Sequence, residues 1–518
     1  MKKAALFIYL LFSVSRCLFA QPRTGADDPE MAKEHFSHRN YLMAMPIYKS
    51  LVKKEPQNIL YNFRLAQCYL NTNLNKTAAI PFLEFLTKTE NDNDEYWFYL
   101  GKAYSYANRF DDALGTFEVC KGLAGDYRAK ADRQLEMCNN AIEFKKFPKD
   151  ITYVNLGKQI NTQYPDYYPI IAGNESFLIF TTRKPFTGTS QVEIDGYYSS
   201  DIYISYPKDG VWQKPKSIGP QVNTGFDEQA VDLTSDGKAL TVYIDHIDTI
   251  GNIYFSEFAK NIFQKLMRPA EQVNAGFETS GSITSERNMI AFASKRSNGY
   301  GETDIYLLKK LPNGNWAVPQ LLPNTINTKY SEDFPRFTDD GKILYFASEG
   351  HSSMGGYDIF KAGYDNETNT WTTPENLGYP INGAGDDYTI SFTHDSSYAY
   401  MSAAREEGMG DLDLYKLKFN NNTNRFCIVT GYVTTSDTSG MSVKKQILVT
   451  KADSKENFRY TPVKSSGKYI MALLPGKYTI TVKAAGYQEY SFLQVIYDVP
   501  FNPEQQLDFQ LTKEVQKK

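Results

Sequence analysis

The sequence of 518 residues is poor in the side chains that most active sites and structural cross-links need. It contains five His, five Cys and four Trp. So few His leave little material for a zinc site or a His-based acid/base pair. The chain also contains no Gly-x-Ser-x-Gly, no His-Glu-x-x-His and no phosphate-binding loop. We therefore expect a protein that is not an enzyme and that carries no metal and no cofactor.

An excess of charge of one sign is also missing. Lys and Arg together number 56 and Asp and Glu 60, which gives a net charge of -4. Nucleic-acid binding requires a broad basic surface that displaces counterions from the phosphates. We expect no nucleic-acid partner.

Long apolar runs are absent beyond the N-terminus. Residues 1–20 begin with Lys2 and Lys3, continue as an apolar run and end in Leu18-Phe19-Ala20. This arrangement is typical of a secretory signal with cleavage after Ala20. No later segment reaches the ~20 apolar residues that a membrane-spanning helix needs. We expect an exported protein, periplasmic or associated with the outer membrane, without a transmembrane span.

Cysteine is too scarce to hold the fold together. Lipid attachment at Cys17 is a rival to simple cleavage, but the preceding Arg16 fits such a processing site poorly. Four cysteines follow the signal: Cys68, Cys120, Cys138 and Cys427. Cys120 and Cys138 could pair on neighbouring helices, but we favour four small, buried, reduced side chains.

Between residues 27 and 148 the apolar residues recur with helical spacing, and the pattern repeats. Ala44, Ala78 and Ala113 lie 34 and 35 residues apart. The fullest copy contains Trp97, Leu100, Gly101, Tyr104, Ala113 and Phe117. Small residues at this spacing let paired helices touch, and the aromatic residues fill the space between pairs. We expect an α-solenoid.

The spacing resembles the tetratricopeptide repeat. That resemblance implies a concave face able to hold an extended peptide or a partner helix. The inner-helix positions outside the packing set are the candidate partner-binding residues: Phe63, Gln67, Phe98 and Lys102. The alternative is that the solenoid only braces the domain that follows it.

From residue 151 to residue 420, short alternating strands separated by turn residues replace the helical pattern. The phrase Asp-Ile-Tyr or a close variant recurs at intervals of 51, 52, 54 and 55 residues, starting at Asp201, Asn252, Asp304, Asp358 and Asp413. A period near 50 residues with roughly four strands in each unit predicts a β-propeller. We expect five blades, with six as the alternative if a degenerate unit is present.

The two ends of this region predict how the ring closes. The last unit ends at Phe419 without an outer strand, while a spare segment, Ile151 to Gly157, precedes the first unit. We expect the first strand to complete the last blade, since closure removes exposed sheet edges. The repeat resembles those of TolB-type and WD-like bacterial propellers.

Residues 425–512 predict a third, smaller all-β domain. Its strands alternate cleanly, and Pro-Gly and Gly-Lys turns stand where hairpins need them. The phrases Leu474-Pro475-Gly476-Lys477-Tyr478 and Ala485-Gly486-Tyr487 resemble the carboxypeptidase regulatory-like domain, a β-sandwich of prealbumin type. Such domains support or attach other modules.

One set of acidic residues repeats with the propeller units. The positions five residues after each repeated Asn are Asp166, Glu228, Thr279, Glu332 and Asp387. Equivalent positions of a propeller form a ring, so these carboxylates could lie near the central axis and bind a cation. The alternative, which we favour, is that each closes a turn by accepting backbone N–H bonds.

The order solenoid, propeller and regulatory-like sandwich behind a signal peptide resembles a family of periplasmic and outer-membrane-associated proteins that includes PorE of the type IX secretion system. That family normally ends in an OmpA-like peptidoglycan-binding domain, which has no counterpart before Lys518, so wall anchoring is not carried over. The resemblance implies a non-enzymatic scaffold that docks envelope proteins through the solenoid groove and the propeller face.

A second hypothesis is a propeller that recognises or cleaves glycans, because paired carboxylates and aromatic platforms around the axis would suit that chemistry. The Thr234-Ser235-Asp236-Gly237 phrase lacks the Trp of the sialidase box. The distance between carboxylates in the folded chain distinguishes the two hypotheses.

Overall fold

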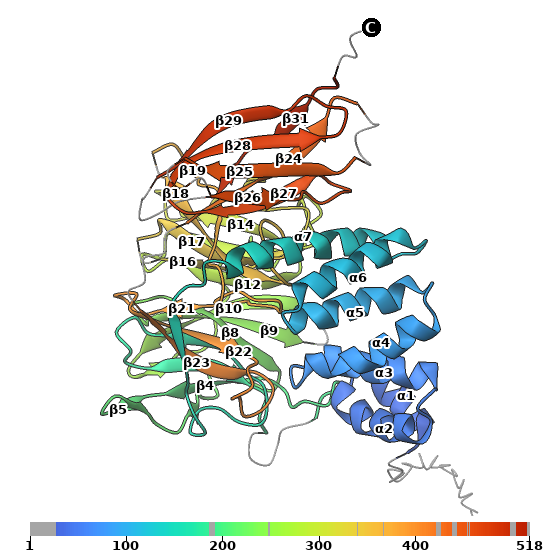
Figure 1. The fold of residues 1–518 in the computed structure, drawn as a ribbon. Helices are drawn as coiled ribbons and strands as arrows, with labels where there is room; N and C mark the ends of the chain where they lie inside the picture. Colours follow the sequence, from blue (N-terminus) through green and yellow to red (C-terminus); the bar gives the residue numbers. More distant parts are fainter. Residues whose placement is uncertain are drawn as a thin grey trace, which may run out of the picture.

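The computed structural model describes residues 27–185, 192–246, 249–338, 340–365, 367–420, 426–437, 443–452, 454, 456–497 and 504–514. The predicted signal segment, with Cys17 and the cleavage site after Ala20, lies outside these residues. The chain folds as a helical N-terminal region followed by an all-β region (Figure 1). We call residues 27–147 the helical module, residues 151–420 the propeller and residues 426–514 the C-terminal module.

Seven α-helices and one short 3-10 helix make up the described part of the helical module. They are α1 (Pro29–Ser37), α2 (Tyr41–Lys54), α3 (Ile59–Leu70), η1 (Lys76–Ala79), α4 (Ile80–Thr89), α5 (Asp94–Tyr106), α6 (Phe110–Gly122) and α7 (Arg128–Lys145). Side-chain oxygens of Asp28, Asn40, Asn58 and Asn93 accept backbone N–H groups at the starts of α1, α2, α3 and α5. These caps satisfy donors that a helix leaves unpaired, so the sequence fixes each start locally.

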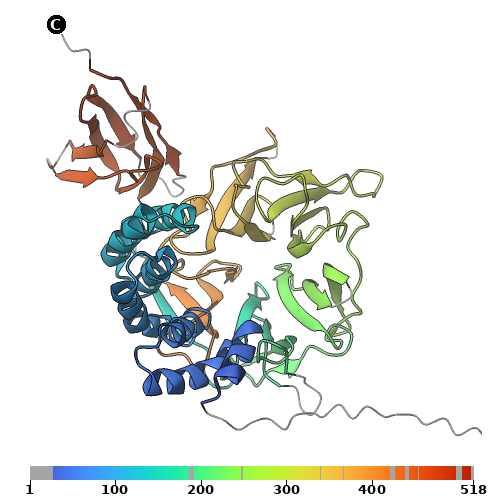
Figure 2. The ribbon, with the colours of Figure 1, turned by 90° about the vertical axis from the view of Figure 1, so that its right-hand side faces the viewer.

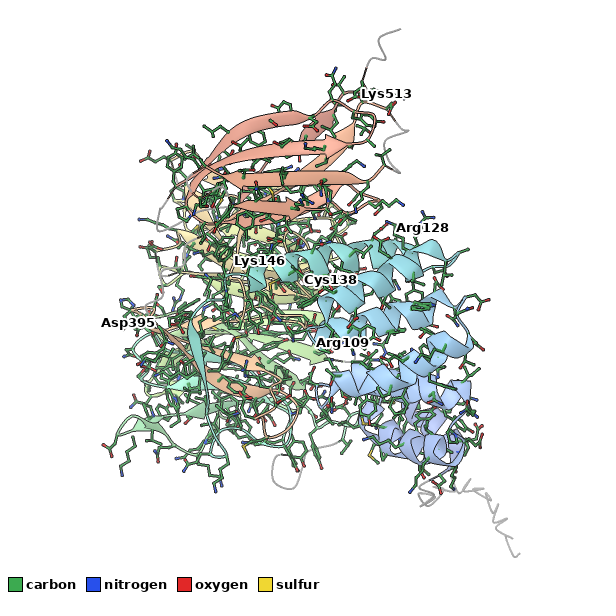
Figure 3. The ribbon with its side chains drawn as sticks, viewed as in Figure 1. Arg109, Arg128, Cys138, Lys146, Asp395 and Lys513 are labelled. Carbon is green, nitrogen blue, oxygen red and sulfur yellow. The ribbon has the colours of Figure 1, made fainter. Side chains whose placement is uncertain are left out.

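Small side chains lie where the helices touch. Ala44 and Ala113 are fully buried, and a Cβ atom at Gly101 would stand 2.5 Å from the Phe117 ring. The four described cysteines are free thiols and buried, as expected, and Cys138 lies on α7 (Figure 3). Burial raises the pKa of the Cys120 and Cys138 thiols to about 12, so they remain protonated packing groups.

The propeller consists of antiparallel sheets arranged in a ring (Figure 2). The first sheet is β2 (Asp166–Ile171), β3 (Leu178–Thr182), β4 (Asp201–Ser205) and β7 (Lys216–Ser217); the second is β8 (Asp227–Leu233), β9 (Ala239–His246), β10 (Thr249–Ala259) and β11 (Ile262–Phe263). The third is β12 (Glu278–Ile283), β13 (Met289–Ser294), β14 (Asp304–Lys309) and β15 (Gln320–Leu321). The fourth is β16 (Glu332–Phe337), β17 (Ile343–Ser348), β18 (Asp358–Asp365), β19 (Thr370–Trp371) and β20 (Glu375–Asn376).

The fifth sheet joins the two ends of the propeller. It contains β21 (Ser391–Phe392), β22 (Tyr398–Ala403) and β23 (Asp413–Phe419), and β1 (Ile151–Asn155) pairs with β23. The pairing is antiparallel, from Ile151 opposite Phe419 to Asn155 opposite Tyr415. The first strand of the propeller therefore lies at the outside of the sheet that is last in sequence. A two-stranded ribbon, β5 (Pro207–Lys208) and β6 (Val211–Trp212), extends from the first sheet.

The repeated Asn residues join each sheet to the next one. Asn327 accepts the Ile305 N–H at 2.8 Å and donates to the Ile305 carbonyl at 3.0 Å. The equivalent pairs are Asn161 with Leu414, Asn223 with Ile202, Asn274 with Ile253, and Asn382 with Ile359. In each pair the residue bonded is the one that follows the repeated Asp or Asn of the Asp-Ile-Tyr phrase. The repeated Asn and the repeated Asp-Ile-Tyr phrase therefore supply the two partners of one hydrogen-bonded contact.

The C-terminal module contains two sheets that enclose one core. One sheet is β27 (Lys468–Leu473), β24 (Cys427–Thr435), β30 (Gln505–Gln506) and β31 (Phe509–Leu511); the other is β26 (Asn457–Tyr460), β25 (Lys445–Lys451), β28 (Gly476–Ala484) and β29 (Tyr490–Ile496). Buried residues of both sheets, among them Val429, Met471 and Ile480, belong to one hydrophobic cluster. Alternation of inward and outward side chains along β28 explains why this face packs.

The three parts share a hydrophobic core. The cluster around Leu100 and Phe117 of the helical module also contains Met354 of the propeller and Ile470 and Ala472 of the C-terminal module. The helices form an arc over one face of the ring, and α7 lies beside the C-terminal module (Figures 1 and 2). No helix among the described residues is long and apolar enough to cross a membrane.

Candidate functional site

Three of the four residues predicted to line a peptide groove are packed inside the helical module. Phe63, Gln67 and Phe98 are only 8%, 9% and 8% exposed. The Phe63 ring lies 4.8 Å from the ring of Tyr96, and the Phe98 ring lies 4.9 Å from that of Tyr127. These side chains fill the space between consecutive helices, so the structure places them in the core of the module and not on a free groove.

Lys102, the fourth predicted residue, is half-buried and lies near the propeller. Its ammonium group is 5.7 Å from the centre of the Tyr106 ring, and the Lys76 ammonium is 5.1 Å from the same ring. Tyr106 and, further off, Asp386 of the propeller raise the pKa of Lys102. This side of the module is therefore turned toward the propeller, which is the bracing arrangement set out as the alternative.

The predicted carboxylates lie at or shortly before the starts of the innermost strands and bond to the turns that precede them. The Thr162 N–H donates to Asp166 at 2.6 Å, and the Thr328 N–H donates to Glu332 at 2.7 Å. The donors from the turns are Thr162 to Asp166, Thr224 to Glu228, Thr328 to Glu332 and Gly383 to Asp387. Each carboxylate thus closes its own turn, which is the role that we favoured over an axial cation site.

The third unit corrects the predicted spacing. Its turn carboxylate is Glu278, one residue before the predicted Thr279, and Arg296 pairs with Glu278 at 2.9 Å. Thr279 instead donates to Asp333 of the neighbouring sheet at 2.9 Å. The turn from Asn274 to Glu278 is one residue shorter than the corresponding turn of the other units. A fixed spacing cannot anticipate a turn of different length.

Burial makes these carboxylates hold their protons unusually tightly. It raises the pKa of Asp166 to about 6 and the pKa values of Glu228, Glu332 and Asp387 to about 7. The neighbouring carboxylate of Asp304 adds to the rise at Glu332. Low dielectric and a like charge both disfavour the ionised form.

A metal site does not emerge from this set. Within the described ranges, no group of three or more His, Cys, Asp or Glu side chains is arranged to hold a metal ion. The oxygens of Glu332 are occupied by Thr328 and Ser348. The carboxylates are spread over separate turns and do not converge on one point.

Aromatic side chains of three sheets meet near the starts of the innermost strands. The Phe334 ring lies 4.8 Å from Tyr168 and 5.4 Å from Tyr388, and Tyr388 lies 5.1 Å from Tyr357. Tyr168 belongs to the first sheet and Phe334 to the fourth, which are not neighbours in the ring. The rings therefore meet near the axis of the propeller. All four are half-buried, and we call these four residues the axial cluster.

Backbone strain holds two members of the axial cluster in place. Tyr168 and Phe334 have φ angles of +50° and +51°, a region that bulky side chains rarely adopt. Each stands at a register shift of its strand and directly precedes a proline. Such a conformation costs about 1–3 kcal/mol and is concentrated at binding sites and switches. The dipeptides Tyr168-Pro169 and Phe334-Pro335, at equal positions in two repeats, are its signal in the sequence.

Carboxylates surround the axial cluster. Burial raises the pKa values of Tyr357 and Tyr388, and the charges of Asp333, Glu349 and Asp386 raise them further. Of these three carboxylates, Asp386 is exposed and accepts the Tyr357 N–H at 3.1 Å. Elsewhere on the innermost strands, Arg336 pairs with Asp232 of the second sheet at 3.2 Å, which links two further strands of the ring.

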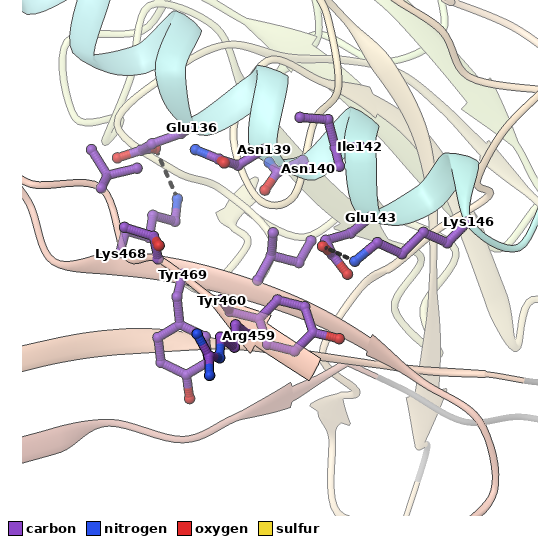
Figure 4. A pocket seen from close by; sticks show the side chains of 13 residues that line it. Glu136, Asn139, Asn140, Ile142, Glu143, Lys146, Arg459, Tyr460, Lys468 and Tyr469 are labelled. Carbon is purple, nitrogen blue, oxygen red and sulfur yellow. Dashed lines mark hydrogen bonds and ion pairs between the residues drawn. The ribbon is translucent and has the colours of Figure 1, made fainter. Parts of the chain in front are cut away.

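A cavity of about 230 Å³ lies between α7 and the C-terminal module (Figure 4). Glu136 of α7 pairs with Lys468 at 3.1 Å across it, and Glu143 pairs with Lys146 on the same helix. Burial raises the pKa of Glu143, which also accepts the Ala472 N–H at 3.2 Å. Because these charges are matched across the gap, the cavity belongs to a joint between the two modules.

Comparisons with known proteins assign no family and no site to this chain. No protein-family model matches the chain, and no curated protein matches it. Among solved structures, TolB from Acinetobacter baumannii is 14% identical, with 61% of this chain and 69% of that chain covered and a TM-score of 0.33. A TolB from Agrobacterium tumefaciens is 13% identical, with 52% and 98% covered and a TM-score of 0.29.

An enzyme shares this level of similarity. The β-1,2-mannobiose phosphorylase from Listeria innocua is 12% identical, with 52% of this chain and 96% of that chain covered and a TM-score of 0.33. Similarity this distant supports no conclusion about this chain.

Proposed function

We propose that the protein is a non-enzymatic scaffold that docks partner proteins of an envelope complex on its propeller face. The observation that supports it most is the core shared by the three parts, in which Met354 of the propeller and Ile470 of the C-terminal module pack with the helical module. A shared core keeps the exposed surfaces in fixed relative positions, which suits binding by preformed surfaces.

In this proposal the helical module is a tetratricopeptide-type solenoid that braces the propeller. Arg133 of α7 donates to the carbonyls of Glu349 and Gly350, and Asn140 donates to the Ser353 carbonyl at 2.8 Å. These bonds fix α7 on the loop between β17 and β18. The propeller has five blades closed by β1, and the C-terminal module is a sandwich of the carboxypeptidase regulatory-like type.

The compartment follows from the predicted signal segment. Export with cleavage before Gln21 would place the scaffold in the periplasm or at the outer membrane. A type IX secretion complex or a related assembly would supply its partners there. Glycan cleavage fits less well, because the predicted carboxylates Glu228, Glu332 and Asp387 each bond to a turn.

The test is recovery of partners by the tagged full-length protein after cross-linking in its native envelope. We expect one or a few proteins in fixed ratio to the scaffold. The variant Arg133→Glu, whose carboxylate repels the carbonyls of the β17–β18 loop, should lower that recovery. The matched control is Arg128→Glu, on the exposed start of α7, which should not lower it (Figure 3). Recovery no greater than that of an unrelated exported protein would overturn the proposal.

A further inference from the structure

The axial cluster combines three properties that packing alone does not require. Two of its rings come from strands β2 and β16 and two from the loops before β18 and β21, two of them stand on strained backbone, and each remains partly exposed. Ring faces carry negative charge density and attract cations within about 6 Å of the ring centre. The exposed carboxylate of Asp386 accepts the Tyr357 N–H at 3.1 Å, which places a negative charge beside this cluster.

Basic groups already lie around this region, but they are partnered elsewhere. The charge of Lys295 lowers the pKa of Asp333, and the charge of Arg133 lowers the pKa of Glu349. Arg133 also donates to the backbone of the β17–β18 loop. Lys76 donates to the Leu70 carbonyl at 2.8 Å. These basic groups reduce the local negative charge. None of them has a ring of the axial cluster as its cation–π partner.

A lysine of the helical module shows how an ammonium group is bound at this end of the propeller. The ammonium group of Lys102 lies 5.7 Å from the centre of the Tyr106 ring, and Tyr106 and the exposed carboxylate of Asp386 raise its pKa. An ammonium group near an aromatic ring and a carboxylate is therefore stabilised at this position of the helical module.

We propose that the axial cluster receives the ammonium or guanidinium group of a basic side chain on a partner protein. This rests on the proposed function, because it names the chemistry by which the propeller face docks its partner. Asp386, which is exposed, attracts the group, and the rings of Tyr357 and Tyr388 hold it.

The test measures binding of a tetralysine peptide, acetylated and amidated at its ends, to the full-length protein by calorimetry at low and physiological salt. The control peptide carries the same chain with each ammonium acetylated. Tyr388→Leu keeps the bulk of the side chain and removes the ring, and Asp386→Asn removes the charge. The matched control is Asp395→Asn, in the turn between β21 and β22 on the side away from the helices (Figure 3).

We expect saturable binding of one tetralysine for each chain and none of the acetylated peptide. Tyr388→Leu should weaken binding about tenfold, as loss of a desolvated cation–π contact implies, and Asp395→Asn should leave it unchanged. Asp386→Asn should weaken it less, and more at low salt. If Tyr388→Leu lowers the melting temperature strongly, Tyr357→Leu replaces it.

Two results would overturn the inference. Equal affinity for the acetylated peptide would show that charge is not recognised, and weakening by Asp386→Asn without weakening by either ring variant would show attraction to the surface alone.

Partner recovery separates this inference from the proposed function. If the recovered partner is not displaced by tetralysine, docking stands and the axial site is wrong; if no partner is recovered, the scaffold is wrong whatever tetralysine does.

Discussion

At the scale of single residues, the repeated Asn side chains explain why this propeller is stable without disulfides. Each amide satisfies both a backbone N–H and a carbonyl of the preceding sheet, as Asn327 does for Ile305. Removing one partner of a buried hydrogen bond costs more than the bond contributes, because the other group stays buried and unpaired. The amide is therefore hard to replace by an apolar side chain.

Asn327→Ala should destabilise the protein by about 1–3 kcal/mol, since it leaves the buried Ile305 N–H without its acceptor and removes the amide donor from the Ile305 and Leu322 carbonyls. Asn327 is fully buried. The control is Asn315→Ala, at an exposed turn position, which should change stability little. Denaturant unfolding of both variants measures the difference, and equal stability of the two would mean that water replaces the amide.

The buried turn carboxylates make stability depend on pH in the direction opposite to a paired acid. Glu332 ionises near its ordinary value of 4.5 when unfolded and holds its proton to about 7 when folded. Between these values the folded state binds more protons, so stability falls as pH rises. Asp166, Glu228 and Asp387 contribute in the same direction, up to about pH 6 for Asp166 and about pH 7 for the others.

The melting temperature should therefore be higher at pH 5.5 than at pH 8, as calorimetry can measure. Glu332→Gln imitates the protonated side chain, so this variant should be more stable than the parent at pH 8 and similar to it at pH 5. Glu406→Gln, at an exposed loop position, is the control and should keep the dependence of the parent. A parent that is more stable at pH 8 would contradict the assignment.

At the scale of elements, closure of the ring depends on a short strand. β1 contributes five residues to the fifth sheet, and the Tyr153 hydroxyl donates to the Pro380 carbonyl at 2.7 Å. The Leu156 N–H donates to the Leu414 carbonyl at 3.1 Å. Because donors alternate along an antiparallel pair, the Val154 N–H, two residues earlier, also belongs to the ladder.

Val154→Pro should destabilise the protein by about 1–3 kcal/mol, because proline removes the ladder donor and exposes the edge of β23. The Val154 side chain is 50% exposed, so Val154→Ser is a matched control that loses the same side chain and keeps the donor. Thermal unfolding compares the two. Equal melting temperatures would show that β1 is not needed for closure.

At the scale of the whole molecule, α7 is the element that joins the three parts. Asp132 accepts the Ser465 hydroxyl of the C-terminal module at 2.6 Å, while Arg133 bonds to the propeller on the other side. The guanidinium of Arg133 also lies 4.6 Å from the centre of the Tyr330 ring. One helix thus determines the angle between the helical module and both all-β regions.

Arg133→Ala should loosen the helical module from the propeller, since it leaves the carbonyls of Glu349 and Gly350 without their donor. We expect faster trypsin cleavage at the connection around Lys149 and a broader unfolding transition. Arg128→Ala removes an exposed arginine from the same helix and should leave both unchanged. Identical cleavage rates for the two variants would show that the hydrophobic core alone holds the modules together.

The sequence alone determined the order of the regions and the repeat that produces the propeller. Hairpin turns, strand alternation and the Asp-Ile-Tyr and Asn phrases are local signals, and they recur at nearly constant intervals because each sheet is built from one unit. The role of the turn carboxylates was also predictable, since a carboxylate and the N–H of its own turn lie within a few residues of each other, as in Asp166 and Thr162.

Only the tertiary structure decided which surfaces remain free. The meeting of Tyr168 with Phe334 depends on two β-bulges and on strands far apart in sequence, and the turn role of Glu278 in place of position 279 depends on a turn that is one residue shorter than its counterparts. Burial of Phe63 and Phe98 likewise depends on how helices stack. A single extra residue reverses the side of a strand that a side chain faces, so spacing alone could not place the axial cluster.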